Sequence, residues 1–203
     1  MPMSAAKPCS AVAAIWTGTP KAIGRIIERL HVDQRMAHSD EPILIREYDP
    51  TWPDQFDEIA ARARTALGSL VVRIEHIGST AVPGLAAKPI VDLDVVVSPQ
   101  DVLEAIQRLS DVGYVHEGNL GIAEREAFRP PPGEPRHHLY VVSETATELQ
   151  RHVAFRDALR ADPTLRAKYA ALKRTLAAQH GNNRDTYLEA KSGFITDALS
   201  STT

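Results

Sequence analysis

The most constraining feature of the chain is a short apolar run, residues 89–97, that carries two aspartates, Asp92 and Asp94. Its β-branched residues predict a buried strand, and alternate residues of a strand point to the same face, so both carboxylates share one side. Because unpaired buried carboxylates are costly, that side must meet water or a cation. Hard oxygen ligands favour Mg²⁺ or Mn²⁺, whose coordination substrate phosphates usually complete. The alternative is a strand whose second face is simply exposed to solvent.

A turn of small residues precedes this strand. Residues 71–77 predict a strand that ends at Gly78, and Ser79 and Thr80 begin a turn or a short helix. Because glycine lets a ligand approach the backbone closely, Gly78, Ser79 and Thr80 are candidates for binding phosphate oxygens. A Walker-type phosphate loop is excluded, since no Gly-Lys-Ser/Thr sequence follows, and Ser79 lies in no Gly-x-Ser-x-Gly hydrolase motif.

Three basic residues are candidate phosphate ligands. Lys88 is the strongest of them because it directly precedes the acidic strand. Arg136 is equally compatible with ordinary surface charge. Lys191 shares a helical face with Tyr187, so it either extends along that apolar face to solvent or points back toward the acids.

Composition limits the class of protein and its partners. The chain has 203 residues, 43% of them hydrophobic, which suits one domain with a terminal appendage. A net charge of -3 provides no drive toward nucleic acid or anionic membranes, so we expect a phosphorylated small molecule as ligand, no sequence-specific nucleic acid and no membrane. Cys9 is the single cysteine, which excludes an internal disulfide and is consistent with a cytoplasmic location. The sequence leaves open whether the protein forms a homodimer or binds a partner enzyme.

The pattern of the chain divides it into three parts. Residues 1–40 predict a Pro/Ala/Ser-rich extension, partly mobile, with a short amphipathic helix at 20–31. Residues 41–145 predict an α/β core and residues 146–203 a C-terminal helical subdomain. Strands are expected at 43–45, 71–77, 89–97, 114–117, 127–129 and 137–142, and helices at 51–67, 99–112, 149–159, 163–180 and 185–199.

Segments across residues 43–197 resemble the GrpB family. The resemblance rests on residues 45–53 and 72–92, and on the shorter segments 137–139, 155–160 and 187–191. That family looks like a branch of the nucleotidyltransferase superfamily related in fold to polymerase beta. The resemblance implies an α/β (α+β) fold with a mixed β-sheet flanked by helices, a phosphate-binding turn at Gly78 and Ser79, and metal ligation by Asp92 and Asp94. A homologous domain is fused to some bacterial dephospho-CoA kinases.

One departure from the superfamily pattern affects the functional interpretation. Catalytic members usually add a third carboxylate on a neighbouring strand, expected here at 137–142, where no acid occurs. His138 or Tyr140 takes the inward position instead, and a neutral histidine can act as general base or ligate a transition metal. The sequence therefore favours two functions. One is nucleotidyl transfer from an NTP, with Asp92, Asp94 and His138 as catalytic residues; the other is a noncatalytic module that binds a nucleotide or CoA-like ligand and supports a partner such as dephospho-CoA kinase.

Overall fold

The structure is a computed structural model that describes residues 43–180 and 183–200. Contacts between Cα atoms separate Met1–Glu41 from Pro42–Thr203, and the described residues all lie in the second unit. The predicted extension at 1–40 and its helix at 20–31 lie outside the described residues. The predicted division of the second unit at residue 145 stays a prediction.

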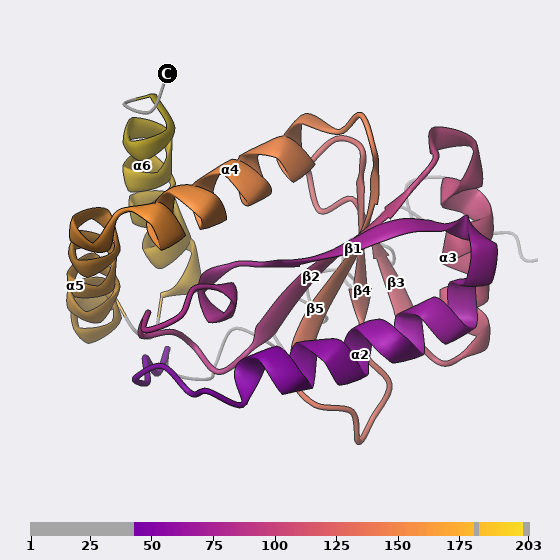
Figure 1. Cartoon of the computed structure of the whole chain (residues 1–203), viewed down its shortest axis with the longest axis horizontal. Coiled ribbons are helices and arrows are strands. Elements are labelled where there is room, and N and C mark those ends of the chain that lie inside the picture. Colours follow the sequence, from indigo (N-terminus) through magenta and orange to yellow (C-terminus); the bar gives the residue numbers. More distant parts are fainter. Residues whose placement is uncertain (1–42, 181–182, 201–203) are drawn as a thin grey trace, which may run out of the picture. The chain divides into compact units, whose positions relative to one another are not determined.

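The described residues form one mixed sheet with the strand order β1-β2-β5-β4-β3 (Figure 1). Strand β2 pairs with β1 in antiparallel and with β5 in parallel orientation, and β3, β4 and β5 continue as an antiparallel meander. The strands are β1 (Val71–Ile77), β2 (Val91–Val97), β3 (Val115–Gly118), β4 (Arg125–Arg129) and β5 (His137–Ser143). The expected mixed sheet is confirmed, and β2 lies inside it with a partner on each side.

Helices cover both faces of this sheet, as the expected fold class requires. Figure 1 shows α2 and α4 on opposite sides of it, with α5 and α6 beside α4 at one end. The helices are α2 (Trp52–Leu67), α3 (Val102–Asp111), α4 (Thr147–Ala161), α5 (Pro163–His180) and α6 (Arg184–Ser200), and short 3-10 turns lie at Gly68–Leu70, Ser79–Ala81 and Pro99–Asp101. None of the described helices combines the length and hydropathy that crossing a membrane requires.

The two faces of β2 have different environments. Its odd-numbered residues, among them Leu93 and Val95, are buried in the main core with side chains of α2 and α3. Its even-numbered residues face the other way, and Val96 packs with Leu149 at the start of α4. Alternation along the strand therefore places Asp92 and Asp94 on the face that α4 covers.

One predicted strand is absent from the described residues, and the ends of β2, β3, β4 and β5 differ from the prediction by one or two residues. The strand expected at 43–45 is wrong: only an isolated bridge between Arg46 and Ala87 forms there, because Ile43 instead packs against Leu176 and Tyr187 of the helical part. Strand β2 also begins at Val91 and not at residue 89, since proline at 89 has no N–H to donate to a ladder.

Candidate phosphate and metal site

Asp92 and Asp94 lie on one face of β2, and each is paired with a histidine. Nδ1 of His138, on β5, lies 2.7 Å from Asp92 Oδ1. Nδ1 of His152, on α4, lies 2.8 Å from Asp94 Oδ2. The Asp92 side chain is 27% exposed, whereas that of Asp94 is fully buried. The acids are thus adjacent, and Asp92 is the more accessible of the two.

The environments of the two acids shift their pKa values in opposite directions. Burial alone would raise the pKa of Asp92, but the hydrogen bond and charge of His138, with the charges of Lys191 and His152, hold it below its usual value. Burial dominates at Asp94 and raises its pKa despite the contact with His152. Asp92 is therefore the carboxylate that stays ionised most readily.

His152 lies between two carboxylates. Its Nε2 is 3.2 Å from Glu148 Oε1, one helical turn earlier on α4, and its Nδ1 faces Asp94. Burial would lower the pKa of His152, but Asp94 and Glu148 on either side raise it above its usual value. A protonated His152 therefore offsets the charge of Asp94 from the helix that covers the sheet. His152 was not among the residues predicted from the sequence, although its spacing from Glu148 is a typical helical i, i+4 pair.

One carboxylate oxygen of Asp94 is unsatisfied. Asp94 Oδ1 is buried and has no hydrogen-bond partner among the described residues. Within the same described part of the chain, no group of three or more His, Cys, Asp and Glu side chains could hold a metal by itself. Two carboxylates, one with an unsatisfied oxygen, fit a Mg²⁺ or Mn²⁺ ion that arrives with phosphate ligands of its own. They do not fit a closed structural metal site.

The turn that follows β1, residues 78–81 and here called the glycine turn, abuts Asp92. Gly78 has φ of 71°, and a Cβ built on it would lie 2.3 Å from Asp92 Oδ2. Both facts require glycine at this position. The predicted phosphate turn and the predicted metal ligand are thus brought into direct contact.

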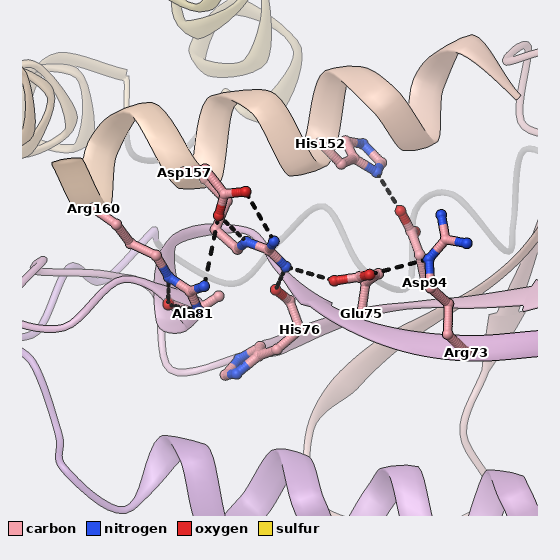
Figure 2. A network of polar contacts seen from close by, with 9 residues as sticks. Arg73, Glu75, His76, Ala81, Asp94, His152, Asp157 and Arg160 are labelled. Atoms are coloured by element: carbon pink, nitrogen blue, oxygen red, sulfur yellow. Dashed lines mark hydrogen bonds and ion pairs between the residues drawn. The ribbon is translucent and has the colours of Figure 1, made fainter.

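Two arginines of α4 donate to the carbonyl of His76, which precedes the glycine turn, and to that of Ala81, its last residue; Figure 2 shows the contact of Arg160 with Ala81. Arg156 Nη1 donates to Glu75 Oε2 at 2.8 Å and to the His76 carbonyl at 3.1 Å. Arg160 donates to the Ala81 carbonyl through Nε at 3.0 Å and Nη2 at 2.7 Å. These contacts connect the glycine turn with the segment 155–160, and both carry the family resemblance.

The side chain of Thr80, a predicted phosphate ligand, has hydrogen-bond partners inside the fold, and its role at a ligand stays a prediction. Its side chain is buried, its Oγ1 donates to the Ile90 carbonyl at 3.4 Å, and His76 Nε2 lies 3.1 Å from it. The His76 ring in turn stacks on Phe56 at 4.5 Å between centroids. Burial, with Arg160 and Arg156 nearby, lowers the pKa of His76 to about 4 against the opposing charge of Asp92. Thr80 and His76 therefore brace the turn from within the fold.

The three predicted basic residues occupy different positions. Lys191 Nζ lies 5.3 Å from the centre of the Tyr187 ring, and its charge lowers the pKa of Asp92. Lys88 is half-buried just before the acidic strand, and Arg136 is exposed at the start of β5. The charge of Lys191 thus acts on Asp92.

A fourth basic residue, which was not predicted from the sequence, contacts the glycine turn directly. Lys173 of α5 is 1% exposed, and its Nζ donates to Ser79 Oγ at 2.8 Å and to the Ala86 carbonyl at 2.5 Å. Burial, with the charges of Lys191 and of the neighbouring arginine, lowers its pKa to about 7, against the opposing charge of Asp92. In the sequence, Lys173 follows Tyr169 by four residues and so lies on the same apolar face of α5. This spacing is the signal from which its burial could have been predicted.

The fold and this site define an α+β protein in which a mixed sheet presents two carboxylates beside a glycine turn held by C-terminal helices. The model of the GrpB protein family matches residues 42–201, and the chain belongs to this family.

Individual relatives agree with this assignment. The UPF0157 protein YqkA of Bacillus subtilis is 36% identical over 152 residues, which cover 74% of this chain and only 44% of that relative. A dephospho-CoA kinase of Mycolicibacterium paratuberculosis is 27% identical over 93% of this chain and 56% of its own length. Among solved structures, GrpB from Enterococcus faecalis matches with a TM-score of 0.69 and 34% identity, over 78% of this chain and 99% of that one. The chain thus spans about half of the first two of these relatives.

Proposed function

We propose that this chain binds a nucleoside triphosphate together with Mg²⁺ or Mn²⁺ and transfers its nucleotidyl group to an acceptor. One observation carries the proposal: Asp92 and Asp94 share a face of β2, and the glycine turn touches Asp92 so closely that no side chain fits at Gly78. The resemblance of the GrpB family to nucleotidyltransferases supports the same reaction class.

Each group of the site has a role in this proposal. Asp92 and Asp94 would hold the divalent ion, which when bound neutralises charge on the phosphate chain. The backbone amides at Gly78 and Ser79, with the Ser79 hydroxyl, would bind phosphate oxygens. Lys191 would add positive charge from α6, and Lys88 and Arg136 are further candidate cations. His138, oriented by Asp92, would accept the proton of the acceptor as general base.

The test is binding followed by turnover. We expect calorimetry to detect NTP binding that requires Mg²⁺ or Mn²⁺, and an enzyme-coupled assay to detect pyrophosphate once an acceptor is supplied. Asp92→Asn should weaken metal-dependent binding at least about tenfold, because a neutral amide is a poor ligand for a hard cation. Asp57→Asn, an exposed change on α2, is the matched control. Equal affinity of the Asp92 variant and the control would refute the assigned site.

A second candidate function has specific support. Both acids are paired with histidines, and β5 supplies His138 where a third carboxylate would be expected. The similarity to a protein named dephospho-CoA kinase suggests a module that binds a nucleotide or CoA-like ligand and supports a partner enzyme. Tight nucleotide binding without pyrophosphate release over a broad acceptor panel would favour this module over the transferase.

A further inference from the structure

Lys173 is a buried cation with no acidic partner in the part of the chain that the structure describes. It lies 94 positions after Ser79 in the sequence, and it is 1% exposed. Its Nζ lies 4.7 Å from the centre of the Tyr169 ring, a contact that offsets part of the cost of burial. Burying a lysine without a counter-ion is unfavourable, and a methionine would fill the same apolar position. Because its Nζ contacts Ser79, we expect Lys173 to have a function at the glycine turn.

The hydrogen bonds of Lys173 determine how Ser79 can interact with a ligand. A protonated lysine has three donors and no acceptor, so Ser79 Oγ must accept from it and keeps its own hydrogen for another partner. A neutral lysine keeps two N–H donors and gains a lone pair, so it can either donate to Ser79 Oγ or accept the Ser79 hydrogen. Only the protonated form rules out the second arrangement and so always leaves the Ser79 hydrogen for a partner other than Lys173.

The environment of Lys173 makes its charged and neutral forms about equally populated near pH 7 in the absence of a ligand. Burial, and next the charges of Lys191 on α6 and Arg174 on α5, disfavour the charged form, and Asp92 on β2 favours it. Tyr169, one turn earlier on α5, has its pKa raised by burial and by the charge of Asp92, against the effect of a hydrogen bond with Ser79, so its neutral phenol is a further hydrogen-bond partner of this hydroxyl. An anion that binds at the glycine turn adds negative charge next to Ser79 and so shifts Lys173 toward the protonated form.

We propose that Lys173 is a positioning residue that couples binding of an oligophosphate at the glycine turn to the uptake of up to one proton from solvent. This inference rests on the proposed function for the place of the phosphate chain, and adds how the turn recognises it. Binding and protonation strengthen each other: a protonated lysine cannot accept the Ser79 hydrogen, which stays available to the phosphate, and the bound phosphate stabilises the proton on Lys173.

The test uses inorganic tripolyphosphate without metal, so that it does not depend on metal binding at the acids. Calorimetry in buffers of different ionisation enthalpy measures the protons taken up per ligand. Because the pKa of free Lys173 is about 7, we expect Lys173 to contribute an uptake of about one half proton at pH 7 and about 0.9 at pH 8. Tripolyphosphate also exchanges protons in this range, so the contribution of Lys173 is the uptake of the wild type minus that of a variant without this lysine.

Variants assign the proton to Lys173. Lys173→Met should abolish this contribution to the uptake and weaken tripolyphosphate binding about tenfold or more, whereas Lys168→Met, an exposed change on the same helix, should alter neither. Ser79→Ala should weaken binding, because the hydroxyl that donates to the phosphate is gone. Proton uptake by Lys173→Met that equals that of the wild type at both pH 7 and pH 8 would overturn the inference.

The inference and the proposed function fail separately. If Asp92→Asn leaves Mg²⁺-dependent NTP binding unchanged while the proton uptake still depends on Lys173, the proposed metal site is wrong and the role of Lys173 stands. If Asp92→Asn removes that binding and Lys173→Met takes up as many protons with tripolyphosphate as the wild type, the role of Lys173 is wrong and the metal site stands. A folded wild-type protein that binds neither probe overturns both.

Discussion

Replacing His76 should remove a defined part of the acid sensitivity of this protein. The ring is packed against Phe56 and lies close to Arg156 and Arg160, and its pKa falls to about 4. In the unfolded chain a histidine titrates near 6.5. Between these values the unfolded state binds a proton that the folded state does not, so the free energy of unfolding falls as pH falls. Below pH 4 this contribution no longer changes.

The size of the effect follows from the two pKa values. Linkage gives a loss of about 2 kcal/mol from His76 between pH 7.5 and pH 5. Urea unfolding of the wild type and of His76→Phe at both pH values measures it, because other titrating groups contribute equally to both proteins. The variant should lose about 2 kcal/mol less than the wild type over this interval.

A second variant separates titration from packing. His76→Gln keeps a polar group near Thr80 and cannot titrate, so it should show the same reduced pH dependence as His76→Phe even though its stability at pH 7.5 differs. If both variants lose as much stability as the wild type between pH 7.5 and pH 5, the reasoning about a neutral, buried His76 is refuted.

Three further changes test how the glycine turn is built. Gly78→Ala should lower the free energy of unfolding by about 1–3 kcal/mol in chemical denaturation, because φ is positive and the new Cβ collides with Asp92; stability equal to the wild type would contradict this. Arg160→Met should cost about 1–2 kcal/mol through lost hydrogen bonds to the Ala81 carbonyl, with Arg160→Lys recovering part of it in the same assay. Lys173 has a lowered pKa of about 7, so wild-type stability should rise by about 2 kcal/mol from pH 7 to pH 9, and Lys173→Met should show no such rise.

The sheet was predictable because its signals are local. The runs that form β1, β2 and β5 are rich in β-branched and aromatic residues, and the alternation of side chains along a strand is enough to place both aspartates of β2 on one face. The strand expected at 43–45 failed because its isoleucines pack against helices about 130 residues later in the chain, a preference that no local pattern reveals.

The helical side chains that hold the glycine turn in place were much less predictable than the sheet. Charged residues on helices are usually solvated, so Lys173 and Arg156 gave no reason to expect burial or contact with the glycine turn. Their partners, Ser79 and the His76 carbonyl, lie on distant segments of the sequence. Helical spacing did place Lys173 on the face of Tyr169, but spacing alone cannot distinguish a buried amine from one that extends to solvent.

The separation in sequence between the glycine turn and its supports bears on how this protein is synthesised. The turn leaves the ribosome early, whereas the side chains of α4 and α5 that hold it follow 79 to 94 residues later. At translation rates of about 5–20 residues per second, a nascent chain exposes the turn unsupported for several seconds. Ligand capture by ribosome-bound chains should therefore begin only after α5 has emerged from the exit tunnel.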